Sequence, residues 1–223
     1  MPRRFFLLLL GLIAGPLLAQ PGGYSPALNG RIEGKTYISA TGTYRIMIPV
    51  LPELGGNVSD TPNVVIFRDS FNIHISIGTF PQDATQRWEL STRGLKDYLV
   101  YFFGTYVLPD FGQFSPDCRV ESATFAPGIM DGSLITYLLL PGGSMFSDKH
   151  AILGINETPP VAKRGNLLFV RNGYIYVVST ELAERVSEGG SYQKTTAQED
   201  EILRQRLTEI VFKMEFARPA VAP

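Results

Sequence analysis

Apolar and polar residues alternate along much of the chain, and this period of two is typical of β-strands with one buried face. The clearest run is 71–77, where odd-numbered positions are apolar and even-numbered ones polar: Phe71, Ile73, Ile75 and Ile77 against Asn72, His74 and Ser76. Because neighbouring residues of a strand point to opposite faces, this segment is predicted to be a half-buried antiparallel strand. Similar runs predict hairpins over 35–48, 64–77, 118–140 and 167–178, the last turning at Asn172-Gly173.

The period changes to three and four residues in two regions, which predicts helices there. Between 83 and 107 we expect two helices. Asp83 is expected to cap the first, a short helix that contains Trp88. Ser91 is expected to cap the second, and Pro109 is expected to end it. The capping-box sequence Thr196-Ala197-Gln198-Glu199 is expected to begin a C-terminal helix. The apolar stripe of that helix is Leu203, Leu207, Ile210, Val211 and Met214.

Together these elements predict the fold class α+β, with an antiparallel β-sheet of about six to eight strands flanked by the middle and C-terminal helices. We expect a single domain over residues 31–216, preceded by a Pro- and Gly-rich lead-in at 20–30 and followed by a C-terminal tail at 217–223. The stretch 141–164 is predicted to be a long irregular loop, and loops of that length in a compact domain are usually functional or mobile.

The first 19 residues have the pattern of a secretory signal peptide. Arg3 and Arg4 precede an uncharged apolar run over 5–19 that is broken by Pro16 and ends at the small residue Ala19. A bilayer-spanning helix needs about 20 apolar residues, so we expect cleavage, no stable membrane span afterwards, and a periplasmic or extracellular location. An uncleaved anchor and a twin-arginine export signal are the alternatives.

Composition narrows the chemistry further. The chain has 20 Lys and Arg against 21 Asp and Glu, so it lacks the basic surplus that nucleic-acid binding needs. One Cys and two His exclude a disulfide framework within the chain, a multi-thiolate metal site and a three-histidine centre. We therefore expect no metal and no cofactor. Cys118, at the start of a predicted strand, is expected to be buried and inert rather than paired with another chain.

The hairpin at 37–49, Tyr-Ile-Ser-Ala-Thr-Gly-Thr-Tyr-Arg-Ile-Met-Ile-Pro, resembles the beginning of PsbP-like domains. Those domains continue with a hairpin, a long helix, further antiparallel strands and a C-terminal helix, similar to the order expected over 31–216. The resemblance implies an α/β/α sandwich and a role in binding or assisting other proteins. The resemblance identifies no functional residue in this chain, because the sequence matches no site motif of the PsbP-like domains.

Candidate catalytic residues are few. Ser144, Asp148 and His150 lie together in the 141–164 loop and would be the catalytic residues of a secreted hydrolase, although triad members usually converge from separate elements. Asp148, His150 and Glu157 could hold a hard cation, but no EF-hand spacing supports this, and a solvated loop is the simpler interpretation. His74 is expected to be solvated or hydrogen-bonded on the polar face of its strand.

The densest aromatic cluster lies in the second predicted helix: Tyr98, Tyr101, Phe102, Phe103 and Tyr106. At about 100° per residue, Tyr101 falls off the apolar face and Phe103 lies at its edge, so these two rings are the candidates for contact with a partner. The sequence thus favours an exported, non-enzymatic binding or assembly module with a protein partner in the cell envelope. The alternative is the secreted hydrolase that uses the 141–164 loop.

Overall fold

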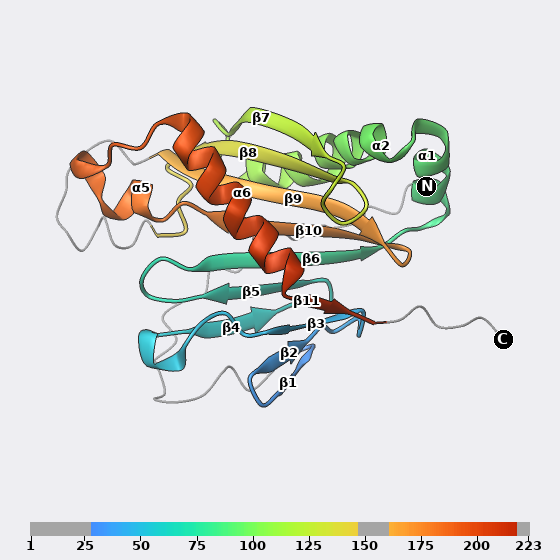
Figure 1. The fold of residues 1–223 in the computed structure, drawn as a ribbon, viewed down its shortest axis with the longest axis horizontal. Helices are drawn as coiled ribbons and strands as arrows, with labels where there is room; N and C mark the ends of the chain where they lie inside the picture. The colour runs from blue at the N-terminus through green and yellow to red at the C-terminus, as the bar shows by residue number, and fades with distance from the viewer. Residues whose placement is uncertain (1–27, 147–160, 218–223) are drawn as a thin grey trace.

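The computed structural model describes residues 28–146 and 161–217 (Figure 1). Its centre is a seven-stranded antiparallel sheet in the order β4-β5-β6-β10-β9-β8-β7. The bounds are β4 (Asn57–Asp60), β5 (Val64–Arg68), β6 (His74–Pro81), β7 (Arg119–Ala126), β8 (Ser133–Pro141), β9 (Val161–Arg171) and β10 (Tyr174–Glu181). All the predicted hairpins within this sheet are confirmed, since β5 pairs with β6, β7 with β8, and β9 with β10.

A second, four-stranded sheet lies beside the first, in the order β1-β2-β3-β11. It contains β1 (Arg31–Glu33), β2 (Thr36–Ile38), β3 (Tyr44–Met47) and β11 (Met214–Phe216). The hairpin of β2 and β3 is the one predicted over 35–48. The strand β11 was not predicted: Met214 was assigned to the apolar stripe of the last helix, but it pairs with Ile46 of β3.

Helices cover both faces of the seven-stranded sheet (Figure 1). On one face lie α1 (Ala84–Arg93), α2 (Leu95–Phe102), a π turn (Phe103–Val107) and α3 (Leu108–Phe114). On the other face α6 (Thr196–Phe212) crosses the strands, preceded by the short helix α5 (Glu184–Ser187). Two 3-10 turns, Pro52–Leu54 and Gly189–Ser191, complete the structure. The predicted α+β class, with an antiparallel sheet flanked by helices, is confirmed.

Two cores follow from the alternation of side chains along the strands. On β9, Leu167 and Phe169 belong to the core that contains Leu203 and Leu207 of α6. Leu168 belongs instead to the core formed with α2, the π turn and α3. Because β6 and β9 lie inside the sheet and are covered on both faces, they bury both sets of side chains. The prediction of a half-buried strand at 71–77 is therefore wrong, and His74 and Ser76 are buried.

Several predicted boundaries are shifted. Asp83 caps α1 as expected, accepting a hydrogen bond from the Gln86 amide, but α2 begins after Gly94 rather than at Ser91. Pro109 does not stop a helix: it lies in the first turn of α3, where its missing N–H costs no hydrogen bond. The cap of α6 is Thr195, one residue earlier than predicted, and it forms a capping box with Gln198.

The irregular loop predicted over 141–164 extends too far, because its last four residues belong to a strand. Val161 to Arg164 belong to β9, which pairs with β8 from Val161 opposite Pro141 onward. Residues 147–160, with Asp148, His150 and Glu157, lie outside the described residues, as do the signal peptide and the tail from 218 onward. Among the helices of the described residues, none is long and apolar enough to span a bilayer.

Gly165 allows α6 to lie close against β9. A Cβ atom added there would lie 3.0 Å from Leu207 Cδ1 and 3.3 Å from Leu203 Cβ. We therefore expect Gly165→Val to lower the free energy of unfolding by about 2 kcal/mol, because a larger side chain overpacks this contact. Urea denaturation measures the effect. Gly128→Val, where an added Cβ meets no atom within 4 Å, is the control and should change stability by no more than about 0.5 kcal/mol. Equal stability of the two variants would contradict this explanation.

Candidate functional site

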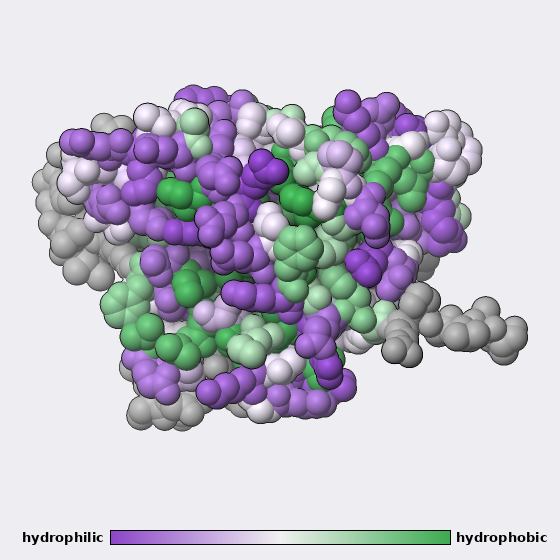
Figure 2. Space-filling model, viewed as in Figure 1, coloured by the Kyte–Doolittle hydropathy of each residue, from purple (hydrophilic) through white to green (hydrophobic). Residues whose placement is uncertain are grey.

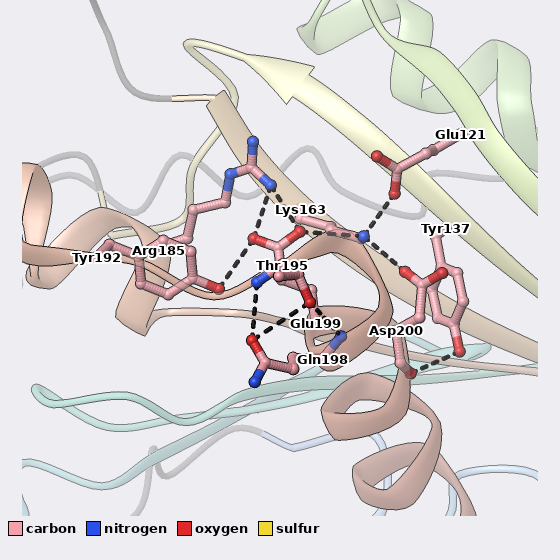
Figure 3. Close-up of polar contacts among 9 residues, drawn as sticks. All are labelled: Glu121, Tyr137, Lys163, Arg185, Tyr192, Thr195, Gln198, Glu199 and Asp200. Atoms are coloured by element: carbon pink, nitrogen blue, oxygen red, sulfur yellow. Dashed lines mark hydrogen bonds and ion pairs between the residues drawn. The ribbon is translucent and has the colours of Figure 1, made fainter.

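A fully buried lysine lies between the sheet and the first turn of α6 (Figure 3). Lys163 of β9 has 0% of its surface exposed. Its Nζ atom forms ion pairs with Glu121 Oε2 at 2.5 Å, Asp200 Oδ1 at 2.6 Å and Glu199 Oε2 at 3.1 Å. The ring centre of Tyr137 is 5.5 Å from the same nitrogen. These carboxylates come from β7 and α6, so Lys163 links three elements of the fold.

Two local features of the backbone bring the carboxylates to Lys163. A β-bulge between Val120 and Ser122 leaves Glu121 without a partner in the pairing of β7 with β8, so its side chain can reach Lys163. The capping box of Thr195 and Gln198 begins α6 one residue before the predicted position. Glu199 is therefore not the capping residue that the sequence suggested, and its carboxylate is available to the buried cluster.

A second set of contacts surrounds Glu199. Arg185 Nη1 donates to both of its carboxylate oxygens at 2.9 Å, and the Tyr192 hydroxyl donates to Glu199 Oε1 at 2.9 Å. Burial lowers the pKa of Lys163, but its contacts with Asp200, Glu121 and Glu199 outweigh burial, so the pKa lies above its ordinary value. A protonated lysine with three carboxylate partners has no lone pair for nucleophilic attack. We interpret this cluster as an anchor for α6 rather than as a reaction centre.

A separate buried charge cluster lies on the opposite face of the sheet, around Glu181 at the end of β10. Glu181 Oε2 accepts hydrogen bonds from Arg164 Nη2 at 2.8 Å and from the Met145 amide at 3.1 Å. Glu181 Oε1 accepts one from Ser144 Oγ at 2.6 Å, and the Phe146 amide donates to the same Ser144 oxygen at 3.0 Å. Through these contacts Glu181 holds the segment 144–146 against the sheet.

His74 lies at the edge of this cluster and is 3% exposed. Neither ring nitrogen has a hydrogen-bond partner in another described residue, and Arg164 Nε also lacks one. Burial, followed by the positive charges of Arg164 and Arg68, lowers the pKa of His74 to about 3. The imidazole is therefore neutral at physiological pH. The expectation of a solvated or hydrogen-bonded histidine is wrong, because β6 is covered on both faces.

The candidate residues of the hydrolase alternative are only partly visible. Ser144 is buried, and its hydroxyl donates to the carboxylate of Glu181 rather than to a histidine. A serine nucleophile needs a base that accepts its proton, and this carboxylate is already bound to Arg164. Asp148 and His150 lie outside the described residues, so their distance from Ser144 is not defined.

The two candidate contact residues of the aromatic cluster differ in exposure. Tyr101 is half-buried, with the Arg93 guanidinium 4.5 Å above its ring centre. Phe103 is 5% exposed and packs in the core of the helical layer, so its expected exposure is wrong. Phe103 lies four residues after Leu99, so both side chains face the same core, where the sheet covers them. Cys118 is half-buried, and burial raises the pKa of its thiol.

Lys163 and Arg164 were missed at the sequence level. They precede a glycine and lie next to a long segment without clear alternation, a pattern that indicates an exposed loop. The signal that could have found them is the alternation of β9 itself, which continues backwards from Phe169 through Leu167, Gly165 and Lys163.

A small cavity lies between the hairpin of β2 and β3 and the turn that joins β4 to β5. Its volume of about 10 Å³ is enough for one water molecule. The lining includes hydroxyl and amide groups of Ser39, Thr41, Thr61, Asn63 and Thr79. A cavity of this size holds no organic substrate.

Figure 2 shows hydrophobic residues at the surface at the lower left and the upper right of the face drawn, as well as along its middle. The group at the lower left lies over the β5–β6 turn and the segment before β4, where Leu51, Leu54 and Phe71 are exposed. The group at the upper right lies beside α1 and α2. The exposed apolar side chains of the helical layer α1–α3 are Trp88, Val100 and Phe114.

Removal of the Lys163 charge would leave Glu121, Glu199 and Asp200 close together without the shared cation. We expect Lys163→Met to lower the free energy of unfolding by about 3 kcal/mol at pH 7. Because the remaining carboxylates repel one another and take up protons more readily, the loss should shrink at pH 5. Urea denaturation at both pH values measures this.

The matched control is Arg45→Met, which removes the cation of an exposed ion pair with Glu215. That change should cost no more than about 0.5 kcal/mol at either pH. A Lys163→Met protein as stable as the wild type at pH 7 would show that the cluster does not anchor α6.

Comparison with known proteins finds similarity to solved structures alone, at low sequence identity. No family model and no curated protein matches it. Among solved structures, it is similar to the Ran-binding protein Mog1p of Saccharomyces cerevisiae, with 10% identity over 85% of this chain and 96% of that one, at a TM-score of 0.47. It is similar to PsbP (CyanoP) of Synechocystis sp. PCC 6803, with 14% identity over 84% and 98% of the two chains and a TM-score of 0.46. A protein of Bacteroides thetaiotaomicron matches with 11% identity and a TM-score of 0.42, over 84% of this chain and half of that protein. A PsbP is thus among the solved structures to which the chain is similar, as the sequence resemblance led us to expect.

Proposed function

We propose that this chain is an exported, non-enzymatic binding or assembly module of the cell envelope that acts through protein–protein contact. The observation that carries the proposal is the exposure of large apolar side chains on the helical layer. Trp88 of α1 is 61% exposed, and Val100 of α2 and Phe114 of α3 are also exposed. Exposed aromatic side chains of this kind commonly provide the central contacts of protein interfaces.

Tyr101 and Arg93 extend this apolar surface with groups that interfaces favour. The guanidinium of Arg93 lies over the Tyr101 ring and also forms an ion pair with Glu89 at 2.5 Å. The Tyr101 ring contacts Tyr106 edge to face, with 6.1 Å between ring centres. These contacts hold the tyrosine in a fixed position, which reduces the entropy lost when a partner binds.

The internal polar groups support binding rather than catalysis. The Lys163 ammonium is saturated by carboxylates, and the Ser144 hydroxyl is bound to Glu181. Both groups are buried by the fold and hold elements of the fold together. The surface of the helical layer, in contrast, presents apolar area that has no role in the two cores.

Export rests on the N-terminal pattern of Arg3, Arg4 and the apolar run that ends at Ala19. We expect the mature protein to begin at Gln20 and to be recovered from the periplasmic or extracellular fraction. N-terminal sequencing of the protein from fractionated cells measures this. A mature chain that retains Met1 and sediments with membranes would favour the uncleaved anchor instead.

The binding surface is tested by cross-linking and pull-down from native envelope extract. We expect a specific partner that is captured by the wild type and lost, by tenfold or more, with Trp88→Ala or Tyr101→Ala, because each change removes aromatic contact area worth about 2 kcal/mol. Phe212→Ala is the matched control, since Phe212 is 64% exposed but lies on α6, on the opposite face of the sheet.

Two results would contradict the binding proposal. One is capture that is equally strong with Trp88→Ala, Tyr101→Ala and Phe212→Ala, which would place the contact elsewhere. The other is turnover of a substrate by the pure protein. If such activity appeared and was abolished by His150→Ala, the hydrolase alternative would replace the binding module.

A further inference from the structure

The buried cluster around Glu181 is part of a row of charged and titratable residues that crosses four strands. In the pairing of β5 with β6, Arg68 lies opposite His74. In the pairing of β10 with β9, Glu181 lies opposite Arg164. The register of β10 with β6 pairs Thr180 with Ile75, so the next position places Glu181 opposite His74. Residues directly opposite each other have Cβ atoms about 5 Å apart.

The order across the sheet is therefore Arg68, His74, Glu181 and Arg164. Glu181 is the one carboxylate in this row, between the imidazole of His74 and the guanidinium of Arg164. Two of the described segments that cover the sheet contact this row. Phe111 of α3 contributes an aromatic ring 5.4 Å from the Arg164 guanidinium. The segment after β8 contributes the Ser144 hydroxyl and the Met145 amide, both bound to Glu181.

We propose that His74 is an acid-sensitive switch, and that its protonation releases segment 144–146 from Glu181. The neutral imidazole leaves Glu181 free to accept hydrogen bonds from Ser144, Met145 and Arg164. When the ring takes up a proton from solvent, a third cation faces the same carboxylate. Glu181 then pairs with the adjacent imidazolium and gives up the Ser144 and Met145 hydrogen bonds.

The direction of the effect follows from linkage between proton binding and opening. In the closed state the pKa of His74 is about 3, against an ordinary value of 6.5 for a solvated histidine. The open state therefore binds the proton at a pH where the closed state does not. As pH falls below 6.5, the closed state loses stability relative to the open state, and the loss continues down to about pH 3.

The contacts of segment 144–146 make its attachment depend on Glu181. Three hydrogen bonds connect it to Glu181: Ser144 Oγ and the Met145 amide donate to the carboxylate, and the Phe146 amide donates to Ser144 Oγ. The side chain of Phe146 packs with Ala183 and Val186, beside the end of β10. Loss of the Glu181 contacts therefore weakens the attachment of Ser144 and Met145, while the hairpin of β9 and β10 keeps its backbone pairing.

Hydrogen exchange of the Met145 and Phe146 amides in the full chain tests the switch. After correction for the intrinsic pH dependence of exchange, we expect their opening equilibrium constant to rise about tenfold between pH 7.5 and pH 5.5. Amides of β10, such as that of Val177, should keep their protection, which distinguishes local opening from global unfolding.

Three variants separate the switch from other causes. His74→Phe should abolish the pH dependence. His150→Gln, at the other of the two histidines in the chain, should leave it unchanged. Ser144→Ala should raise opening by a similar factor at every pH, because it removes a hydrogen bond without changing the titrating group.

If His74→Phe fails to fold, the proton resonances of the His74 ring in the wild type provide the same information. Their titration should coincide with the loss of protection at Met145. An opening constant that does not change between pH 7.5 and 5.5 would overturn the proposal, as would a pH dependence that persists in His74→Phe.

Discussion

The position of α6 depends on one buried ammonium group. A charge removed from water is tolerated only when oppositely charged and polar groups surround it, so Lys163 requires Glu121, Glu199 and Asp200 to be present together. This requirement accounts for otherwise unrelated local features. The bulge in β7 brings in Glu121, the early cap at Thr195 starts α6 where its first turn meets the lysine, and Gly165 gives the helix room to approach.

The two charge clusters share a single strand. Lys163 and Arg164 are adjacent in β9, so the alternation of a strand sends one to each face of the sheet. Lys163 holds α6 and the edge strand β7, whereas Arg164 joins Glu181 and thereby the segment after β8. Each cation is paired with carboxylates from other elements, so the N-terminal end of β9 organises both layers of the fold. Apolar residues further along the strand supply the two cores.

The sequence predicted those parts of the fold whose pattern is local. Asn172-Gly173 defines its hairpin because both residues adopt the positive φ angles that such a turn requires. The stripe of Leu203 and Leu207 likewise defines α6. The start of β9 was missed, since Lys163 and Arg164 have the composition of a solvated loop and are buried only because distant carboxylates meet them. The same holds for His74, whose burial depends on strands and helices that pair with it from elsewhere in the chain. Most residues of the candidate site therefore could not be identified before the tertiary contacts were known.

The buried cluster and the exposed apolar surface are physically connected through α3. Arg164 lies against the ring of Phe111 on this helix, and Phe114, three residues later, is one of the exposed apolar side chains of the helical layer. The Phe111 ring in turn packs in the core beneath the helical layer. Because such cores are closely packed, a shift of that ring has to be accommodated by α3 itself. A continuous series of contacts, from Glu181 through Arg164 and Phe111, therefore joins the buried cluster to the helix that carries Phe114.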